Sequence, residues 1–276
     1  RLGIRLLNRT TRSLTLTDMG ALYFEQCRHI IAGAVAAEQS IMESRDVPKG
    51  QLKISAPVSF GLGYLADVLP EFLNRNPDLD LKIDYNDRMV DVVKDGFDVV
   101  LRVGRLADSS LTARKINSSS GLTLAAPDYW EKHGKPKHPS ELSQHVCLGY
   151  SLSRTPSRWE YRDPSGKSVF VSVSSRMECN SAELNRALAV AGIGVTRLPE
   201  FACRRELDAG LLLPVLQDFA LPPLGIYAVY PHRRHLAPKV RAFIDFMVEK
   251  FGTGAGSMPS LSPDPTLAQN PENTEP

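Results

Sequence analysis

The stretch from Asp18 to Asp46 constrains this chain most, because it has the pattern of one long, uninterrupted helix. Thr17 precedes it as a capping residue, and Pro48 and Gly50 mark its end. At about 1.5 Å per residue such a helix is roughly 40 Å long, more than packing within a small domain requires. We therefore expect an arm between two bodies rather than a helix buried in the core of its own chain. Apolar or small residues recur along it at steps of three and four and predict pairing with a second copy through Tyr23, Cys27, Ile30, Ala34, Ala37 and Ile41.

The composition is that of an ordinary water-soluble protein, with no apolar stretch long enough to span a membrane, and we expect no signal peptide. Four cysteines, Cys27, Cys147, Cys179 and Cys203, show neither disulfide nor metal-ligand spacing. We therefore expect a cytoplasmic protein without a cofactor, and a redox switch between two of these cysteines is the alternative.

The positive charge is concentrated at the start of the chain, where four arginines and no acidic residue precede Thr17. Residues 6–8 and 13–17 have the pattern of two short strands around a basic tip that is rich in hydroxyl groups. Such a hairpin suits the phosphates of a DNA backbone, to which Arg and Thr donate hydrogen bonds. A solvated turn is the alternative interpretation. The expected backbone contacts are Arg5, Arg9, Thr10, Thr11 and Arg12.

The segment from Leu2 to Gly20, LGIRLLNRTTRSLTLTDMG, resembles the end of the winged helix-turn-helix of LysR-type transcriptional regulators. The resemblance extends to about Phe251 and implies the family order of wing, dimerising linker helix and effector-binding domain. It also implies that most of the recognition helix belongs before Arg1. We therefore expect this chain to keep phosphate contacts while lacking the residues that read bases.

From Gln51 onward, strand and helix patterns alternate, as in a mainly parallel sheet covered by helices. The resemblance implies an α/β effector domain with two lobes, like a periplasmic binding protein. We expect residues 1–17 to form the end of the winged unit, 18–47 the linker helix, and 51–252 the effector domain. Lobe I would then comprise 51–121 and 226–252, and lobe II 122–225. Residues 253–276 have the composition of a disordered tail.

The resemblance implies that two helix starts, at Ser59 and at Asn180-Ser181, face each other across an interlobe cleft. Helix starts favour anions, so a small carboxylate is a candidate effector, although both serines can equally serve as caps. With the loops that the family resemblance adds, the expected effector contacts are Pro57, Val58, Ser59, Phe60, Arg102, Gly104, Ala126, Asn180 and Ser181.

Two other classes of protein compete with a transcriptional regulator. Gly61 to Ala66 has the G-x-G-x-x-A spacing of a nucleotide-dependent enzyme, although its glycines can equally permit close helix packing. A solute-binding protein shares the two-lobed fold, but it would carry an export signal and no basic wing. His232 and His235 have H-x-x-H spacing in a basic loop and suggest no third metal ligand. We expect a regulator without catalytic residues whose partners are promoter DNA, a small-molecule effector and a second copy, with RNA polymerase as a further candidate.

Overall fold

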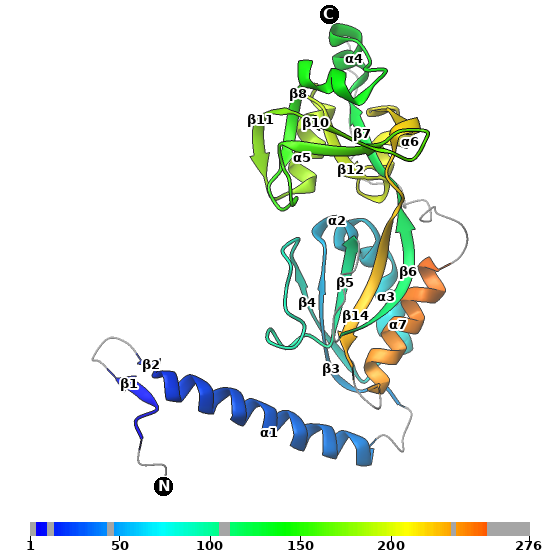
Figure 1. The fold of residues 1–276 in the computed structure, drawn as a ribbon. Coiled ribbons are helices and arrows are strands. Elements are labelled where there is room, and N and C mark those ends of the chain that lie inside the picture. The colour runs from blue at the N-terminus through cyan, green and yellow to red at the C-terminus, as the bar shows by residue number, and fades with distance from the viewer. Residues whose placement is uncertain (1–3, 10–13, 43–46, 105–110, 233–235, 253–276) are drawn as a thin grey trace, which may run out of the picture.

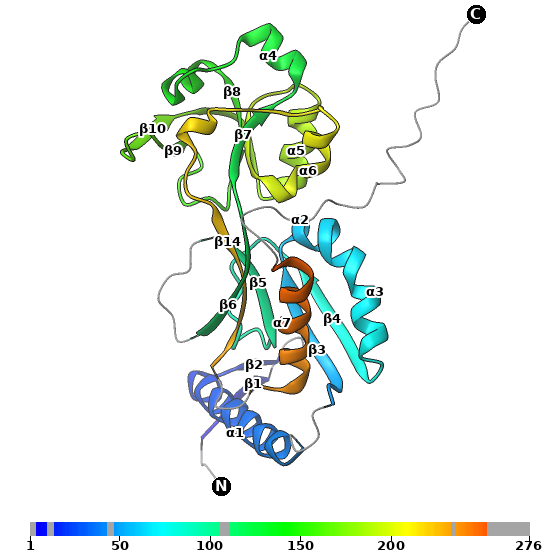
Figure 2. The same cartoon turned by 90° about the vertical axis from the view of Figure 1, so that its right-hand side faces the viewer.

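The computed structural model describes residues 4–9, 14–42, 47–104, 111–232 and 236–252. Figure 1 shows a small hairpin and a long helix at one end, followed by two α/β lobes stacked one beyond the other. The turned view in Figure 2 shows the same order, with two long strands running from one lobe to the other.

The hairpin pairs β1 (Leu7–Arg9) with β2 (Leu14–Leu16) in antiparallel register. Thr17 joins it to the helix, because its Oγ1 accepts a hydrogen bond from Gly20 N–H at 2.9 Å and donates one to the Arg5 carbonyl at 2.8 Å. A Cβ atom at Gly20 would lie 1.8 Å from the Leu6 carbonyl oxygen, so glycine is required for this close approach. The predicted cap at Thr17 is confirmed.

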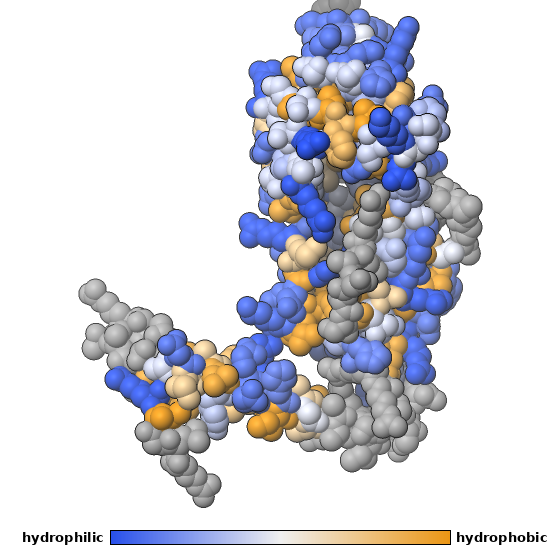
Figure 3. All heavy atoms as spheres, in the orientation of Figure 1, coloured by the Kyte–Doolittle hydropathy of each residue, from blue (hydrophilic) through white to orange (hydrophobic). Residues whose placement is uncertain are grey.

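Helix α1 (Asp18–Met42) forms the predicted arm and is about 37 Å long at the usual rise. Its side chains meet the lobes at Arg28, which donates to the carbonyls of Val93 at 3.3 Å and Lys94 at 3.0 Å. Ile30 and Ile31 are 70% and 62% exposed, and Figure 3 shows hydrophobic side chains open to solvent along this helix. A single chain therefore leaves the apolar side of α1 uncovered.

Lobe I is built on a five-stranded sheet in the order β4-β3-β5-β14-β6. The first three strands are parallel, whereas β14 is antiparallel to both of its neighbours. One continuous helical segment and the C-terminal helix supply buried side chains to its core, among them Phe72 and Phe243. The bounds are β3 (Gly50–Ala56), α2 (Val58–Phe60), the π-helical η1 (Gly61–Leu65), α3 (Ala66–Arg75), β4 (Leu79–Tyr85), β5 (Val99–Gly104), β6 (Leu111–Ser119), β14 (Leu224–Pro231) and α7 (Pro238–Phe251).

Lobe II contains smaller sheets, with β7 between β12 and β13, β8 parallel to β11, and a β9-β10 hairpin. Its main core includes Trp130, Trp159 and Tyr161. The bounds are β7 (Gly121–Ala125), α4 (Pro127–His133), η2 (Pro139–Gln144), β8 (Val146–Tyr150), β9 (Arg158–Arg162), β10 (Ser168–Ser172), β11 (Ser174–Cys179), α5 (Ala182–Val190), β12 (Thr196–Pro199), η3 (Glu200–Ala202), α6 (Arg204–Asp208), β13 (Leu213–Val215) and η4 (Gln217–Phe219).

The two lobes share an aromatic contact beside the crossover strands. Phe201, from η3 in the stretch assigned to lobe II, packs on Phe60 with ring centroids 5.8 Å apart and on Tyr64 at 6.2 Å. Phe251 of α7 also packs on Phe60, with ring centroids 5.6 Å apart. Phe201 and Ala202 thus belong to the core of lobe I. The division into lobes at 122–225 stays a prediction, and Phe201 and Ala202 pack across it against lobe I.

Candidate functional site

The helix starts expected to bind an effector lie on the facing sides of the two lobes, with α2 in lobe I and α5 in lobe II (Figures 1 and 2). Pro57 is the N-cap position of α2 and makes no side-chain capping bond. Ser59 lies within α2, partly exposed, and its hydroxyl has no hydrogen bond to any residue the structure describes. Ser59 is therefore not a cap.

The start of α2 is capped by an acidic side chain from elsewhere in lobe I. Val58 N–H donates to Asp87 Oδ1 at 3.0 Å, and Asp87 follows the carboxyl end of β4. Burial, and secondarily the charge of Glu183, raise the pKa of Asp87, while the Val58 N–H and the Tyr150 hydroxyl act in the opposite direction. The anion expected at this helix start is thus supplied by the chain itself.

The start of α5 in lobe II is also capped internally. Ser181 Oγ accepts from Leu184 N–H at 3.1 Å and lies 3.4 Å from Glu183 Oε2. The other oxygen of that carboxylate, Glu183 Oε1, is buried and has no hydrogen-bond partner within the described part of the chain. Asn185 anchors the helix by donating to the Gly149 carbonyl at 3.1 Å, and it accepts a bond from Cys179 Sγ at 3.3 Å.

Tyr150, at the end of β8, connects the two sides. Its hydroxyl, from lobe II, lies close enough to the Asp87 carboxyl of lobe I to act on the pKa of that group. Burial, followed by the negative charges of Asp87 and Glu183, raises the pKa of Tyr150. We call Asp87, Tyr150 and Glu183 the interlobe cluster. It places two carboxyl groups and a phenol between the lobes, where a ligand with hydrogen-bond donors would be complementary.

The other residues expected to contact the effector lie at several different places in the two lobes. Arg102 donates to the Val90 carbonyl, and Gly104, with φ of 147°, lies opposite Gly225 on β14. Asn180 is exposed beside Ser181. Two expectations are corrected. Phe60 is fully buried in the core of lobe I and offers no side-chain surface, and Ala126 begins α4 at the end of lobe II remote from lobe I (Figure 1).

The members of the interlobe cluster were not among the predicted site residues. The sequence did carry signals for them, because Asp87 follows a strand of a parallel sheet and Glu183 occupies the first turn of a predicted helix. The sequence does not predict that these three residues lie close together, because their proximity depends on how the lobes are stacked.

The features that suggested other classes of protein have structural roles. Gly61 and Gly63 lie within the helical segment η1 and not in a tight turn after a strand. A Cβ at Gly61 would lie 2.2 Å from the Tyr85 ring, so this glycine permits packing and the nucleotide fingerprint is absent from that position. His232 Nδ1 lies 3.2 Å from Thr112 Oγ1, while His235 is outside the described residues. Among described residues, no three His, Cys, Asp or Glu side chains are grouped to hold a metal ion.

The expected DNA and dimer contacts are only partly described. Arg5 is exposed and its Nε donates to the Leu7 carbonyl at 3.0 Å. Thr10, Thr11 and Arg12 lie outside the described residues, as does the side chain of Arg9. On α1, Tyr23, Ile30 and Ala34 are exposed and Cys27 is partly buried, whereas the side chains of Ala37 and Ile41 are not described.

A family model described as the LysR substrate binding domain matches residues 45–252. The chain is also 35% identical to an uncharacterized HTH-type transcriptional regulator of Haemophilus influenzae, over 87% of this chain and 83% of that protein. The chain belongs to the LysR family of transcriptional regulators.

The structure of CrgA, a LysR-type regulator from Neisseria meningitidis, matches this chain with a TM-score of 0.66 and 32% identity, over 90% of this chain and 84% of CrgA. The full-length Vibrio cholerae virulence activator AphB matches with a TM-score of 0.66 and 31% identity, over 90% and 84% of the two chains.

This LysR-type regulator is therefore a DNA-binding transcriptional regulator that senses a small-molecule effector, and its fold is the two-lobed α/β domain of that family. The relatives carry the names of transcriptional regulators and not of enzymes. None of the helices in the described ranges is long and apolar enough to cross a membrane.

Proposed function

We propose that this regulator binds its effector between the lobes, in contact with the interlobe cluster and with the hydroxyl groups of Ser59 and Ser181. The observation that carries the proposal is the buried Glu183 Oε1, which has no hydrogen-bond partner among the residues that can be described. A buried carboxylate oxygen without a donor is costly, and a ligand that supplies one lowers that cost.

The chemistry of the cluster supports an effector that carries hydrogen-bond donors, such as an amine or a polyol. Burial and, secondarily, the charge of Glu183 raise the pKa of Asp87, and Asp87 already occupies the start of α2. A carboxylate effector, expected from the two helix starts, would add a third negative charge there. The structure therefore favours a neutral or cationic ligand at this position over an anionic one.

Such a ligand would also couple binding to the position of the lobes. Tyr150 and Glu183 of lobe II lie close enough to Asp87 of lobe I to act on its pKa, so a donor inserted between the carboxylates strengthens one lobe spacing over another. A ligand shifts a conformational equilibrium only by its difference in affinity for the two states. The proposed contacts differ with lobe spacing because they come from both lobes.

A thermal-shift screen on the full chain tests the proposal, with metabolites arranged in matched pairs that differ by one amino or hydroxyl group. We expect the donor-bearing members to raise the melting temperature, since a ligand stabilises the state it binds. Glu183→Gln should abolish the shift, whereas Glu178→Gln, at an exposed position on β11, should leave it intact. A screen in which no donor-bearing member stabilises the chain more than its matched partner, or in which the donor-dependent shift survives Glu183→Gln, would contradict the site.

We propose in addition that α1 pairs two chains and that the hairpin contacts DNA phosphates. The exposed apolar side of α1, with Ile30 and Ile31 largely open to solvent, supports pairing because contiguous exposed apolar surface indicates an interaction site. Arg5 lies exposed at the start of the hairpin, in reach of a phosphate backbone laid along it.

A further inference from the structure

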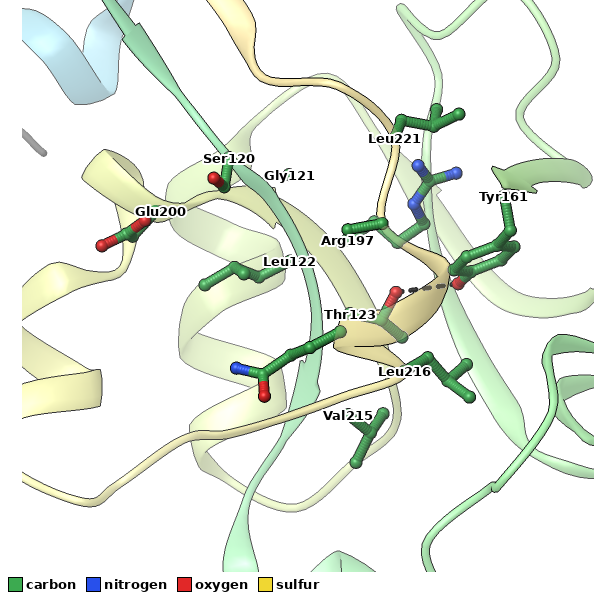
Figure 4. Close-up of a pocket in the computed structure, with 12 residues that line it drawn as sticks. Ser120, Gly121, Leu122, Thr123, Tyr161, Arg197, Glu200, Val215, Leu216 and Leu221 are labelled. Atoms are coloured by element: carbon green, nitrogen blue, oxygen red, sulfur yellow. Dashed lines mark hydrogen bonds between the residues drawn. The ribbon is translucent and has the colours of Figure 1, made fainter. Parts of the chain in front are cut away.

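Lobe II contains a pocket of about 260 Å³ that is separate from the interlobe cluster (Figure 4). It lies over the β7-β12-β13 sheet, and its polar lining includes Thr123, Tyr161 and Arg197, while Leu216 and Leu221 contribute apolar surface. Pockets for drug-sized ligands usually measure about 300–1,000 Å³, so this one suits a smaller molecule.

Arg197 is the unusual member of this lining. Its guanidinium lies over two aromatic rings, 4.9 Å from the Tyr161 ring centroid and 5.6 Å from that of Trp159. It makes no ion pair or hydrogen bond through its side chain with any residue in the described ranges. Burial lowers the pKa of Arg197, which reflects how little water surrounds its charge.

The acidic groups near Arg197 are engaged elsewhere. Glu200 lines the pocket, but its carboxylate is bound by Arg204 at 2.9 Å. Glu160 is close enough for its charge to act on Arg197, yet its Oε1 accepts from the Ser168 hydroxyl at 3.1 Å. The guanidinium therefore retains donors in a fixed fork that is suited to a planar carboxylate.

Two hydroxyl groups stand beside that fork. Thr123 and Tyr161 hydrogen-bond to each other at 2.8 Å, and Figure 4 shows Arg197 next to Tyr161 on the same side of the pocket. A guanidinium, a hydroxyl pair and leucine side chains together match a small molecule with one carboxylate and an apolar body. We propose that this pocket is a second ligand site, specific for small apolar monocarboxylates.

The position of the pocket connects it to the crossovers between the lobes. Ser120 and Gly121 line it where β6 passes into β7, and Leu216 to Leu221 line it shortly before β14 begins. The Ser120 carbonyl accepts from Glu200 N–H at 2.8 Å, directly before Phe201, which packs in lobe I. A carboxylate bound in this pocket would contact both crossovers between the lobes. Its binding would therefore change the stability of these crossovers.

Thermal-shift and calorimetric titrations of the full chain with hexanoate, benzoate and phenylacetate test the proposal, with phenylacetamide as the uncharged partner of phenylacetate. We expect at least one acid to stabilise the chain and the amide to bind about 10- to 100-fold more weakly, as the loss of a charged hydrogen bond predicts. Stabilisation by none of the acids, or equal binding of phenylacetate and phenylacetamide when phenylacetate is the acid that binds, overturns it.

Matched variants separate the pocket from general charge effects. Arg197→Gln should weaken binding of the acid by the same factor, whereas Arg158→Gln should not. Arg158 also lies over a ring, with its guanidinium 4.4 Å from the Phe170 centroid, but it is exposed and is not among the residues that line this pocket. Gln217→Trp obstructs the pocket from an exposed position and leaves Arg197 in place, so it should weaken binding even if Arg197→Gln does not fold. Undiminished binding in Gln217→Trp, or an equal loss in Arg158→Gln, refutes the assignment.

Discussion

Ser59 and Ser181, at the facing helix starts, should respond differently to alanine substitution, although the sequence alone predicts the same capping or binding role for both. Ser181 caps α5 through the bond from Leu184 N–H at 3.1 Å, so Ser181→Ala should lower the free energy of unfolding by about 1 kcal/mol. For a domain of this size, that corresponds to a fall in melting temperature of about 2–4 °C. Ser59 makes no hydrogen bond among the described residues, so Ser59→Ala should stay within about 0.5 kcal/mol of the wild type.

The effector affinity of the same two variants is the second measurement. If the effector lies between the lobes, each loses one neutral hydroxyl contact, and its dissociation constant should rise by a factor that corresponds to about 0.5–1.5 kcal/mol. Urea unfolding of the unliganded chain and calorimetry with a confirmed effector separate the two effects, and Ser172→Ala, at an exposed position on β10, is the control. Affinity unchanged in Ser59→Ala would refute the placement of the effector at α2, and a loss of about 1 kcal/mol of stability would refute the assignment of the cap to Asp87.

Three further predictions follow from the cluster, the arm and the hairpin. Because burial raises the pKa of Asp87, the folded state keeps its proton where the unfolded chain has lost it, so stability should fall as pH rises from about 3.8 through the folded pKa. Asp87→Asn removes that ionisation and should be at least as stable as the wild type at pH 7, with the difference vanishing below pH 3.8; lower stability at pH 7 in denaturant melts contradicts this. Ile30→Asp should halve the mass measured by light scattering, because the charge would be buried without a partner between paired helices, and an unchanged mass excludes the arm as the interface. DNA binding through the hairpin should fall steeply with salt, because contacts to phosphates release counterions, and an affinity that does not change between two salt concentrations would contradict phosphate contacts there.

Local periodicity predicted much of the fold because it reports burial on one face of an element. Helix α1 begins at Asp18 as expected, and the β1-β2 hairpin overlaps the two strands expected at residues 6–8 and 13–17. The strand β6 was missed, since a crossover strand alternates poorly when one part of it is exposed and the other buried. The expectation of a mainly parallel sheet is wrong for β14, which is antiparallel to both neighbours.

The site was harder to predict because its contacts join distant parts of the chain. The cap on Val58 comes from Asp87, and the unsatisfied oxygen of Glu183 depends on the stacking of lobe II over lobe I. Residue spacing cannot report either contact. Arg197 was missed for a related reason, because its significance lies in the absence of an acidic partner within the described structure.

The aromatic contact of Phe201 limits how this regulator can be recombined with others of its kind. A chimera cut at the two crossover strands would import a foreign side chain into a packing site formed by Phe60, Tyr64 and Phe251. Phe60 is fully buried and Phe201 is only 5% exposed, so a mismatch there leaves a void or a clash at the junction itself. Successful exchange of the distal lobe would require η3 to stay with its own lobe I, and biosensor designs that graft new ligand recognition onto this scaffold should keep residues 200–202 native.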